Sequence, residues 1–338
     1  MPLSFRLATF NLENLDDRPG LDPPLSLRID VLRRQLLRLE ADVLCLQEVN
    51  SQHPKGGGPR ALLALDRLLD GTPYAAFERA VTEARGGTGP ADVHNLVLLS
   101  RYPIVGSRSL RHGLVAAPRY RTATARPAET EAVPVEWDRP ILQAEIALPG
   151  ALSSGPPGCR RLHVLNLHLR APLAAPVAGQ KQSPLSWRTT AGWAEGFFLA
   201  TVKRSGQALE ARLLIESLFD REPEALIAVL GDFNAKQREM PLRILCAGPD
   251  DTGNPDLAAR RLIDLSDRLP AARRFTVLHG GQPALLDHLL ASPSLACLVD
   301  SVEAHNEALR DEAVNGDRSL PGSHHAPLVA AFSLPGSD

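Results

Sequence analysis

The sequence predicts a layered α/β fold, and three observations carry this prediction. Short apolar runs of strand length, such as residues 226–230, alternate with segments that repeat leucines at helical spacing, such as residues 26–39. The alternation is irregular, whereas a parallel barrel would need an even succession of strands and helices. No internal repeat or long linker divides the 338 residues, so we expect a single domain over residues 1–338.

The first half of the chain is expected to supply most of the strands. Residues 5–12 alternate between apolar and polar side chains, which predicts a strand that ends near Asn11. The apolar run at residues 42–49 predicts a second, buried strand that ends on Gln47 and Glu48. Other predicted elements of this half are a short helix at residues 60–69, strands at 94–99, 140–148 and 161–169, a loop at 116–137 and a connection at 149–158.

The second half is organised around the apolar run at residues 226–230, which has the pattern of a strand buried on both faces. Gly231 ends this run, and Asp232 and Asn234 follow it with a spacing that sends both side chains to the same side of an extended backbone. Residues 171–186 are rich in proline and lack periodicity, so we interpret them as a loop insertion or a lid. Other predicted elements are helices at residues 206–219 and 239–246 and strands at 275–278, 284–290 and 328–332.

Composition limits the classes of function. The formal net charge of −2 provides no general attraction to nucleic acid or to an anionic membrane, so any phosphate must be bound by a local site. Aromatic residues make up only 4% of the chain, which argues against an extended platform for stacking bases. The four cysteines stand far apart, without the spacing of a zinc site. The N-terminus has no signal-peptide pattern, so a cytoplasmic location is the expectation.

Polar side chains stand at or near the ends of several otherwise apolar strands. They are Asn11, Glu48, Asn166, His168, Asp232, Asn234, Asp287, His324 and His325. Burying such groups without partners is costly, so we expect them to contact one another around a metal ion and an anion. Considered singly, His168 fits a hydrogen-bonded structural histidine, and Asn11 fits a turn residue at the end of a strand.

The order of these segments resembles the endonuclease/exonuclease/phosphatase superfamily, which has the deoxyribonuclease I-like fold. The matching segments are TFNLENL with Asn11, LCLQEV with Glu48, LLSRYPI at residues 98–104, LNLHL with His168, LGDFNA with Asp232 and Asn234, LLDHLLAS with Asp287, and SHHAP with His325. They extend in the order of the family over residues 5–332. The resemblance implies a four-layer sandwich of two mixed β-sheets flanked by helices, with the site at one edge. It also implies hydrolysis of a phosphate ester.

The resemblance further implies a metal ion and an attacking water. Glu48 would be the principal ligand of Mg²⁺ or Mn²⁺, with Asn11 beside it, because both cations prefer hard carboxylate and carboxamide oxygens. Asp232 would orient or deprotonate the water, and Asn234 would donate a hydrogen bond to a phosphate oxygen.

Two histidines are implied to face the phosphate. His325 would do so while Asp287 holds its ring and raises its basicity. His168 resembles the second histidine of the deoxyribonuclease I, sphingomyelinase and inositol-phosphatase branches; the base-excision branch has a tyrosine-containing segment there. Asn166 and Arg170 are candidate substrate contacts, although a solvated surface charge is the commoner role for a residue such as Arg170.

The last motif departs from the family, which usually has Ser-Asp-His where this chain has Ser323, His324 and His325. If His324 takes the place of the aspartate as a metal ligand, its softer nitrogen favours Mn²⁺ over Mg²⁺. The alternative is that His324 is not a ligand and that one metal ion is held by Glu48.

The sequence therefore predicts a divalent-metal-dependent phosphodiesterase, and more specifically a nuclease with endonuclease activity on nucleic acid. One alternative is a phosphatase or phosphodiesterase that acts on a small phosphoester, such as an inositol phosphate, a nucleotide or a phospholipid headgroup. The acidic balance and the few aromatic residues favour this alternative, and the motifs do not separate the two. A second alternative is a non-catalytic binding protein of the same fold. A monomer is the default expectation.

Overall fold

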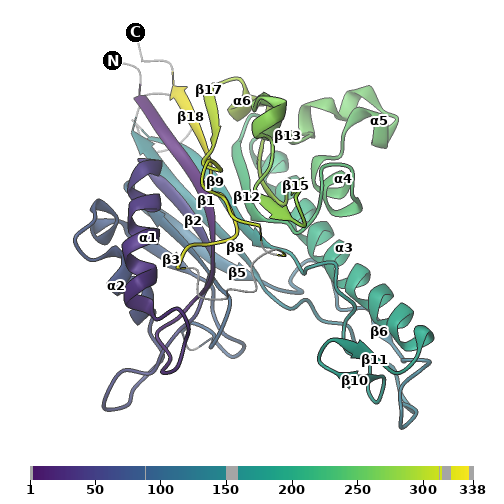
Figure 1. The fold of residues 1–338 in the computed structure, drawn as a ribbon. Helices are drawn as coiled ribbons and strands as arrows, with labels where there is room; N and C mark the ends of the chain where they lie inside the picture. The colour runs from purple at the N-terminus through teal and green to yellow at the C-terminus, as the bar shows by residue number, and fades with distance from the viewer. Residues whose placement is uncertain (1–2, 88, 150–158, 312, 314–320, 335–338) are drawn as a thin grey trace.

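The computed structural model describes residues 3–87, 89–149, 159–311, 313 and 321–334. Two six-stranded mixed β-sheets pack face to face, and helices cover both outer faces (Figure 1). The inward faces of both sheets form one apolar core, in which the rings of Phe5 and Phe332 stack with their centroids 5.0 Å apart. The architecture is the four-layer sandwich that the resemblance implies, and that prediction is confirmed.

The first sheet has the strand order β17-β18-β1-β2-β4-β3, in which β1 and β2 are parallel and the other neighbours are antiparallel. Its strands are β1 (Leu3–Leu15), β2 (Val43–Val49), β3 (Glu78–Val81), β4 (Asn95–Ser100), β17 (Val299–Ala304) and β18 (Leu328–Leu334). Helices α1 (Leu25–Leu39) and α2 (Leu63–Leu69) cover its outer face. Helix α1 does so because its leucines recur at helical spacing and form one apolar stripe.

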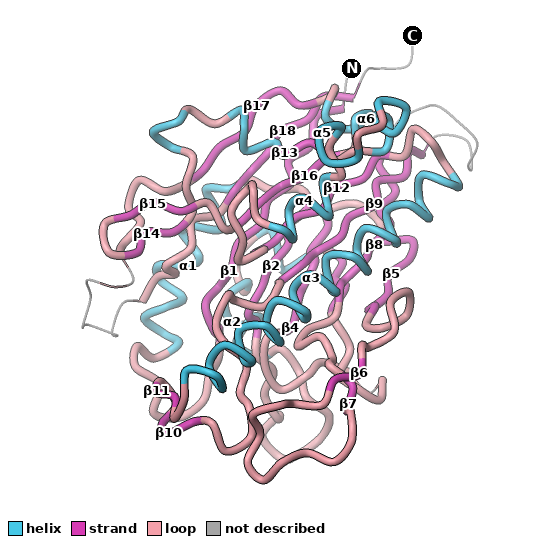
Figure 2. The backbone as a smooth tube through the Cα atoms, turned by 90° about the vertical axis from the view of Figure 1, so that its right-hand side faces the viewer, coloured by secondary structure: helices cyan, strands magenta, loops and turns pink. Residues whose placement is uncertain are grey.

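The second sheet has the strand order β13-β16-β12-β9-β8-β5, in which β9 and β12 are parallel. Its strands are β5 (Ile104–Leu110), β8 (Ile141–Pro149), β9 (Cys159–His168), β12 (Leu226–Asp232), β13 (Ile263–Asp264) and β16 (Asp287–Ala291). Helices α3 (Thr190–Arg221) and α4 (Met240–Cys246) cover its outer face, and Figure 2 shows α3 running obliquely across the strands.

Short elements lie outside the two large sheets and their covering helices. They are the paired strands β6 (Arg119–Tyr120) and β7 (Val133–Pro134), β10 (Lys181–Ser183) and β11 (Ser186–Trp187), and β14 (Val277–His279) and β15 (Gln282–Ala284), the helices α5 (Pro249–Thr252) and α6 (Pro293–Ala296), and the 3₁₀ helices η1 (Pro73–Ala76), η2 (Pro255–Arg260), η3 (Leu265–Arg268) and η4 (Ala271–Arg273). None of the helices in the described ranges combines the length and the apolar character needed to cross a lipid bilayer.

Three sequence-based expectations about secondary structure need correction. Helix α3 begins at Thr190 instead of residue 206, because the Thr189 side chain caps it by accepting a hydrogen bond from the Gly192 N–H. The expected insertion at residues 171–186 is not purely a loop, because it contains β10 and the first residue of β11. Strands β3, β5 and β17 were not expected, since they are short or largely exposed and lack an apolar run. Most of the connection expected at residues 149–158 lies outside the described residues.

Two carboxylates of α3 hold the long loop expected at residues 116–137 against the sandwich. Glu195 accepts hydrogen bonds from the Tyr120 hydroxyl and from the backbone N–H of Thr124. Glu210 is fully buried and accepts a bond of 2.9 Å from the Trp137 indole N–H. The loop therefore has a defined conformation beside α3, although it contains little regular secondary structure.

A polar layer ends the apolar core at one edge of the sandwich. There the Gln47 amide donates to Asn166 Oδ1 at 2.8 Å and contacts the Thr9 hydroxyl at 3.0 Å. The Asn166 amide in turn donates to the backbone carbonyls of Leu46 and Val97 in the opposite sheet. These bonds satisfy buried polar groups and join the two sheets directly beneath the strand ends that carry the candidate site residues.

Replacement of Gly231 by alanine should destabilise the fold. Gly231 has φ +143°, and a Cβ atom there would lie 1.9 Å from the carbonyl oxygen of Leu167 in the neighbouring strand. We expect the free energy of unfolding, measured by urea denaturation, to fall by about 3 kcal/mol or more. Gly106→Ala is the matched control, because Gly106 also lies in a strand and a Cβ there would meet open space. Equal stability of the two variants would contradict this account.

Candidate active site

The register of the second sheet brings three candidate residues into one row. On β12, Asp232 lies opposite Asp287 of β16 and opposite His168 of β9. The inward face of β12 is formed by alternate residues, and Asp232 continues the face that carries Leu230 into the core. All three polar side chains are therefore buried at the edge of the sandwich.

The first sheet contributes Asn11 and Glu48. The Asn11 amide nitrogen donates to Asp232 Oδ2 at 3.0 Å and to Glu48 Oε1 at 3.3 Å, so it joins carboxylates from both sheets. In a regular strand Glu48 would point outward, because Cys45 and Gln47 point inward. A left-handed φ of 59° at Glu48 and a register irregularity in β2 turn the carboxylate toward the site, where Oε2 accepts a bond from the Asn14 N–H.

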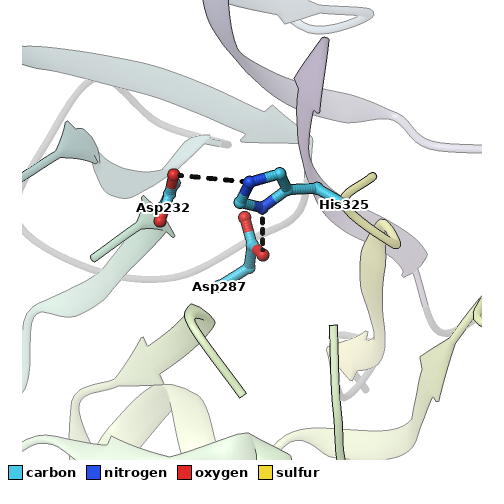
Figure 3. Close-up of side chains that lie close together, drawn as sticks. All are labelled: Asp232, Asp287 and His325. Carbon is cyan, nitrogen blue, oxygen red and sulfur yellow. Dashed lines mark hydrogen bonds and ion pairs between the residues drawn. The ribbon is translucent and has the colours of Figure 1, made fainter. Parts of the chain in front are cut away.

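His325 lies between two carboxylates (Figure 3). Its Nδ1 is 2.8 Å from Asp287 Oδ2, and its Nε2 is 3.9 Å from Asp232 Oδ2. Ser323 fixes the backbone of this segment, because its hydroxyl accepts a bond from the His325 N–H and donates to the Asn11 carbonyl. His325, in the segment that leads into β18 of the first sheet, is thus bonded to Asp287 of β16 in the second sheet.

Burial and charge move the pKa values of this pair in a consistent direction. Burial lowers the pKa of His325, but the carboxylates of Asp287 and Asp232 outweigh it and raise the pKa to about 10. Burial raises the pKa of Asp232 to about 7, with support from Asp287 and Glu48 and opposition from His325. At neutral pH His325 is an imidazolium, and Asp232 is a carboxyl group that readily exchanges a proton.

His168 has the opposite electrostatic character. Burial and the positive charge of Arg139 lower its pKa well below the ordinary value, so the ring is neutral. Its Nε2 lies 3.4 Å from Asp232 Oδ2 and 3.7 Å from Glu48 Oε1. Because a neutral ring that faces two carboxylates must present its N–H to them, we assign the proton to Nε2.

The structure places Asn234 and Asn166 in supporting positions. The backbone N–H of Asn234 donates to Asp232 Oδ1 at 2.8 Å, and its amide donates to Asp232 Oδ2 and to the Leu169 carbonyl. Asn234 therefore orients the Asp232 carboxyl group in this structure. Asn166 lies one step deeper on the inward face of β9 than His168, and its amide contacts belong to the polar layer between the sheets.

His324 and Arg170 are not brought to the cluster. The His324 ring is bonded to Glu13 Oε1 at 2.7 Å, and its backbone N–H is bonded to Glu13 Oε2 at 2.7 Å. Arg170 forms an ion pair with Asp138 and lines a neighbouring cavity instead.

The donor chemistry of the cluster fits a hard divalent cation beside Glu48. Carboxylate oxygens of Glu48 and Asp232 converge on the Asn11 amide, and Asp287 Oδ1 is buried without a hydrogen-bond partner in the described part of the chain. The amide of Asn11 is oriented with its nitrogen toward the carboxylates, so Asn11 would act as a ligand only after a half-turn that presents its oxygen. Asp232, Asp287 and His325 also have potential ligand atoms within 4.8 Å of one another, but an imidazolium at His325 does not ligate a cation.

Sequence reasoning did not identify several residues that shape this site. Arg28 on α1 donates to the carbonyls of Leu12 and Glu13, which stabilises the irregular end of β1. Arg139 and His94 act on the electrostatics of His168. Both could have been found from their place in the sequence, since His94 stands directly before the buried strand β4 and Arg139 stands two residues before the buried strand β8.

The buried carboxylates and histidines at one end of the two sheets provide the acid and base groups that a hydrolase needs. The chain belongs to the endonuclease/exonuclease/phosphatase family, whose model matches residues 8–333, and proteins of this family are phosphoester hydrolases. The resemblance inferred from the sequence motifs is therefore confirmed. A search of curated proteins found no significant match.

Solved structures share the fold at low sequence identity. An endonuclease/exonuclease/phosphatase family protein from Bacteroides thetaiotaomicron is 14% identical, with a TM-score of 0.58 and 99% of each chain covered. A second one, from Bacteroides vulgatus, is 16% identical, with a TM-score of 0.54 and coverage of 98% of this chain and 100% of that chain. Truncated TDP2 of Caenorhabditis elegans is 14% identical, with a TM-score of 0.53 and 97% of each chain covered. At these identities the likeness concerns the fold alone.

Replacement of Asp287 by asparagine should lower the pKa of His325. The Asp287 carboxylate raises that pKa to about 10, so its removal should move the titration of His325 to lower pH by roughly one to three units. Nuclear magnetic resonance of ¹³C-labelled histidine measures the shift directly, without a substrate. The resonance of His163, which lies on the opposite face of β9 from His168, is the internal control. An unchanged His325 titration would contradict the proposed charge pair.

Proposed function

We propose that the protein is a divalent-metal-dependent phosphodiesterase and that it acts on nucleic acid as an endonuclease. The observation that carries this proposal is the arrangement of His325 between Asp287 and Asp232, at 2.8 Å and 3.9 Å. It combines an imidazolium, which stabilises negative charge on a phosphate, with Asp232, whose carboxylate form can accept a proton from water.

Glu48 is the proposed principal ligand of one Mg²⁺ or Mn²⁺ ion, and Asn11 is the second candidate. Such a cation, when bound, polarises the phosphoester and neutralises charge that develops on its oxygens. Its positive charge would also lower the pKa of Asp232 from the value that burial imposes, so that the carboxylate form is available at neutral pH. His324 is proposed to stabilise the end of β1 through Glu13 instead of binding the metal.

Asp232 is the proposed base or orienting group for the attacking water, and Asn234 holds it in position through two hydrogen bonds. His325 and His168 are the proposed donors to the phosphate oxygens, the first as an imidazolium and the second through a neutral Nε2–H. Asp287 fixes the His325 ring so that its Nε2 faces the site. In-line attack places the attacking water opposite the leaving group, so these side chains must surround one phosphate. The strand register, which brings Asp232 beside Asp287 and His168, supports that placement.

A small phosphoester remains the second candidate substrate. The observation that favours it is the net charge of −2, which gives a polynucleotide no general attraction to this chain. The non-catalytic alternative is disfavoured, since Asp232, Asp287 and His325 converge in one cluster and the pKa values of Asp232 and His325 are raised there, a combination typical of catalytic sites.

A substrate panel tests the proposed function. Plasmid DNA, single-stranded DNA, RNA, bis(4-nitrophenyl) phosphate, an inositol bisphosphate and 4-nitrophenyl phosphate should each be incubated with Mg²⁺, with Mn²⁺ and with chelator. We expect internal cleavage of nucleic acid that requires a metal ion and stops in chelator. Turnover of the phosphomonoesters or of the inositol phosphate alone would replace the endonuclease by the second candidate. No turnover of any substrate with either metal would contradict both.

Replacement of Glu48 by glutamine should weaken metal binding by at least tenfold and reduce the rate by several orders of magnitude. The change keeps the shape of the side chain and removes the charge that holds the cation. Calorimetric titration with Mn²⁺ measures the affinity, and thermal denaturation checks that the variant is folded. His324→Gln is the matched comparison, because His324 pairs with Glu13, and its metal affinity should stay near that of the native protein. The reverse order of the two affinities would place the metal at His324.

A further inference from the structure

A cavity of about 500 Å³ beside the candidate active site is rich in basic side chains. We call it the arginine pocket, and its basic residues are Arg85, His94, Arg111, Arg139 and Arg170. They come from four separate segments: the loop between β3 and β4, the end of β5, the approach to β8 and the end of β9. These residues are far apart in the sequence, and the tertiary structure brings them together.

The arginine pocket adjoins the catalytic cluster. The ring of His94 lies against the ring of His168, with their centroids 6.4 Å apart. The charge of Arg139 acts on His168 and is in turn influenced by the carboxylates of Glu48 and Asp232. A ligand group in the pocket would therefore lie next to a phosphoester held at Glu48.

Three carboxylates line the arginine pocket together with its basic residues, namely Glu83, Asp92 and Asp138, and two of them are committed to other partners. Asp92 pairs with Arg18 and Arg60, outside the basic cluster. Asp138 pairs with Lys203 as well as with Arg170, so its charge is shared between two cations.

Two of the arginines lack a carboxylate partner. Within the described residues, Arg111 and Arg139 form no ion pair, and the Nε atom of each is buried without a hydrogen-bond partner. Each guanidinium is partly removed from water, and this burial lowers its pKa. An unpaired cation that is partly removed from water is costly unless an anion joins it.

We propose that the arginine pocket binds a second phosphate group of the substrate, adjacent to the phosphoester that is cleaved. The inference rests on the proposed function, since it assumes that the scissile phosphoester lies in the catalytic cluster. Guanidinium groups present several N–H donors in a planar fork that matches phosphate oxygens. Within the described residues, the only hydrogen bond that either side chain donates runs from Arg111 Nη2 to the Asp138 carbonyl at 3.3 Å. The second phosphate is either the neighbouring phosphodiester of a polynucleotide or a terminal phosphomonoester.

Three matched ligands test the pocket: the thymidine dinucleotide TpT, the same dinucleotide with a terminal phosphate, pTpT, and the trinucleotide TpTpT. Their dissociation constants are measured by calorimetry in chelator, where metal-dependent cleavage does not occur. We expect native protein to bind pTpT or TpTpT at least about tenfold more tightly than TpT, because one charge-assisted hydrogen bond to the additional phosphate is strong enough to change the affinity by that factor. Preference for TpTpT indicates a neighbouring phosphodiester, and preference for pTpT alone indicates a terminal phosphomonoester.

In the variants Arg111→Gln and Arg139→Gln, the ratio of the dissociation constant of TpT to that of the preferred ligand should fall toward one. Arg38→Gln is the matched control, because Arg38 is an exposed residue of α1 on the outer face of the first sheet, and it should keep the native preference. Thermal denaturation checks folding, and the less buried Arg111 decides the test if Arg139→Gln does not fold.

Equal binding of all three ligands by native protein, or a preference that both arginine variants retain, would overturn the inference. The proposed function fails separately, because it is tested by turnover with Mg²⁺ or Mn²⁺. If the protein binds a ligand with a second phosphate more tightly in chelator but cleaves no ligand with either metal, the inference about the arginine pocket is supported and the nuclease assignment is wrong. A protein that cleaves TpT and TpTpT but binds all three ligands equally would keep the nuclease assignment and lose the arginine pocket.

Discussion

Polar contacts between the two β-sheets fix the position of the catalytic cluster. The Asn11 amide bonds to Asp232 at 3.0 Å, the Gln47 amide bonds to Asn166 at 2.8 Å, and the His325 ring bonds to Asp287 at 2.8 Å. In each pair one residue belongs to the first sheet or its C-terminal segment and the other belongs to the second. Because reacting groups must be placed to within a fraction of an ångström, the separation of the sheets is itself part of the site. The packing that stabilises the sandwich therefore also positions the catalytic side chains relative to one another.

Burial has opposite consequences for the two histidines of the cluster. His168 and His325 are both removed from water, which alone favours a neutral ring in each. His325 is nevertheless protonated, since its ring is bonded directly to Asp287, whereas the positive charge of Arg139 adds to the effect of burial on His168. The site thus holds one charged and one neutral donor within a small volume. The difference comes from the neighbours of each ring and not from its depth in the protein.

Strand periodicity made the inward-facing site residues predictable. Asn11, His168 and Asp232 each continue the inward face of an apolar strand, so their convergence follows from alternation and from the order of the motifs. The direction of Glu48 was not predictable, because it depends on a left-handed φ that regular alternation does not contain. The contact of His324 with Glu13 joins residues 311 positions apart, and the arginine pocket draws on four segments. Such long-range contacts depend on the tertiary structure, which local patterns do not specify.

Helix α3 continues beyond the sheets together with β6, β10 and β11, and its carboxylates Glu195 and Glu210 anchor the neighbouring loop (Figure 1). The chemical groups, in contrast, lie on the sandwich itself. The projecting elements and the catalytic side chains are therefore carried by different parts of the fold. Insertions or substitutions in the projecting elements can consequently change the surface that these elements form while the strand register that positions the catalytic side chains is kept.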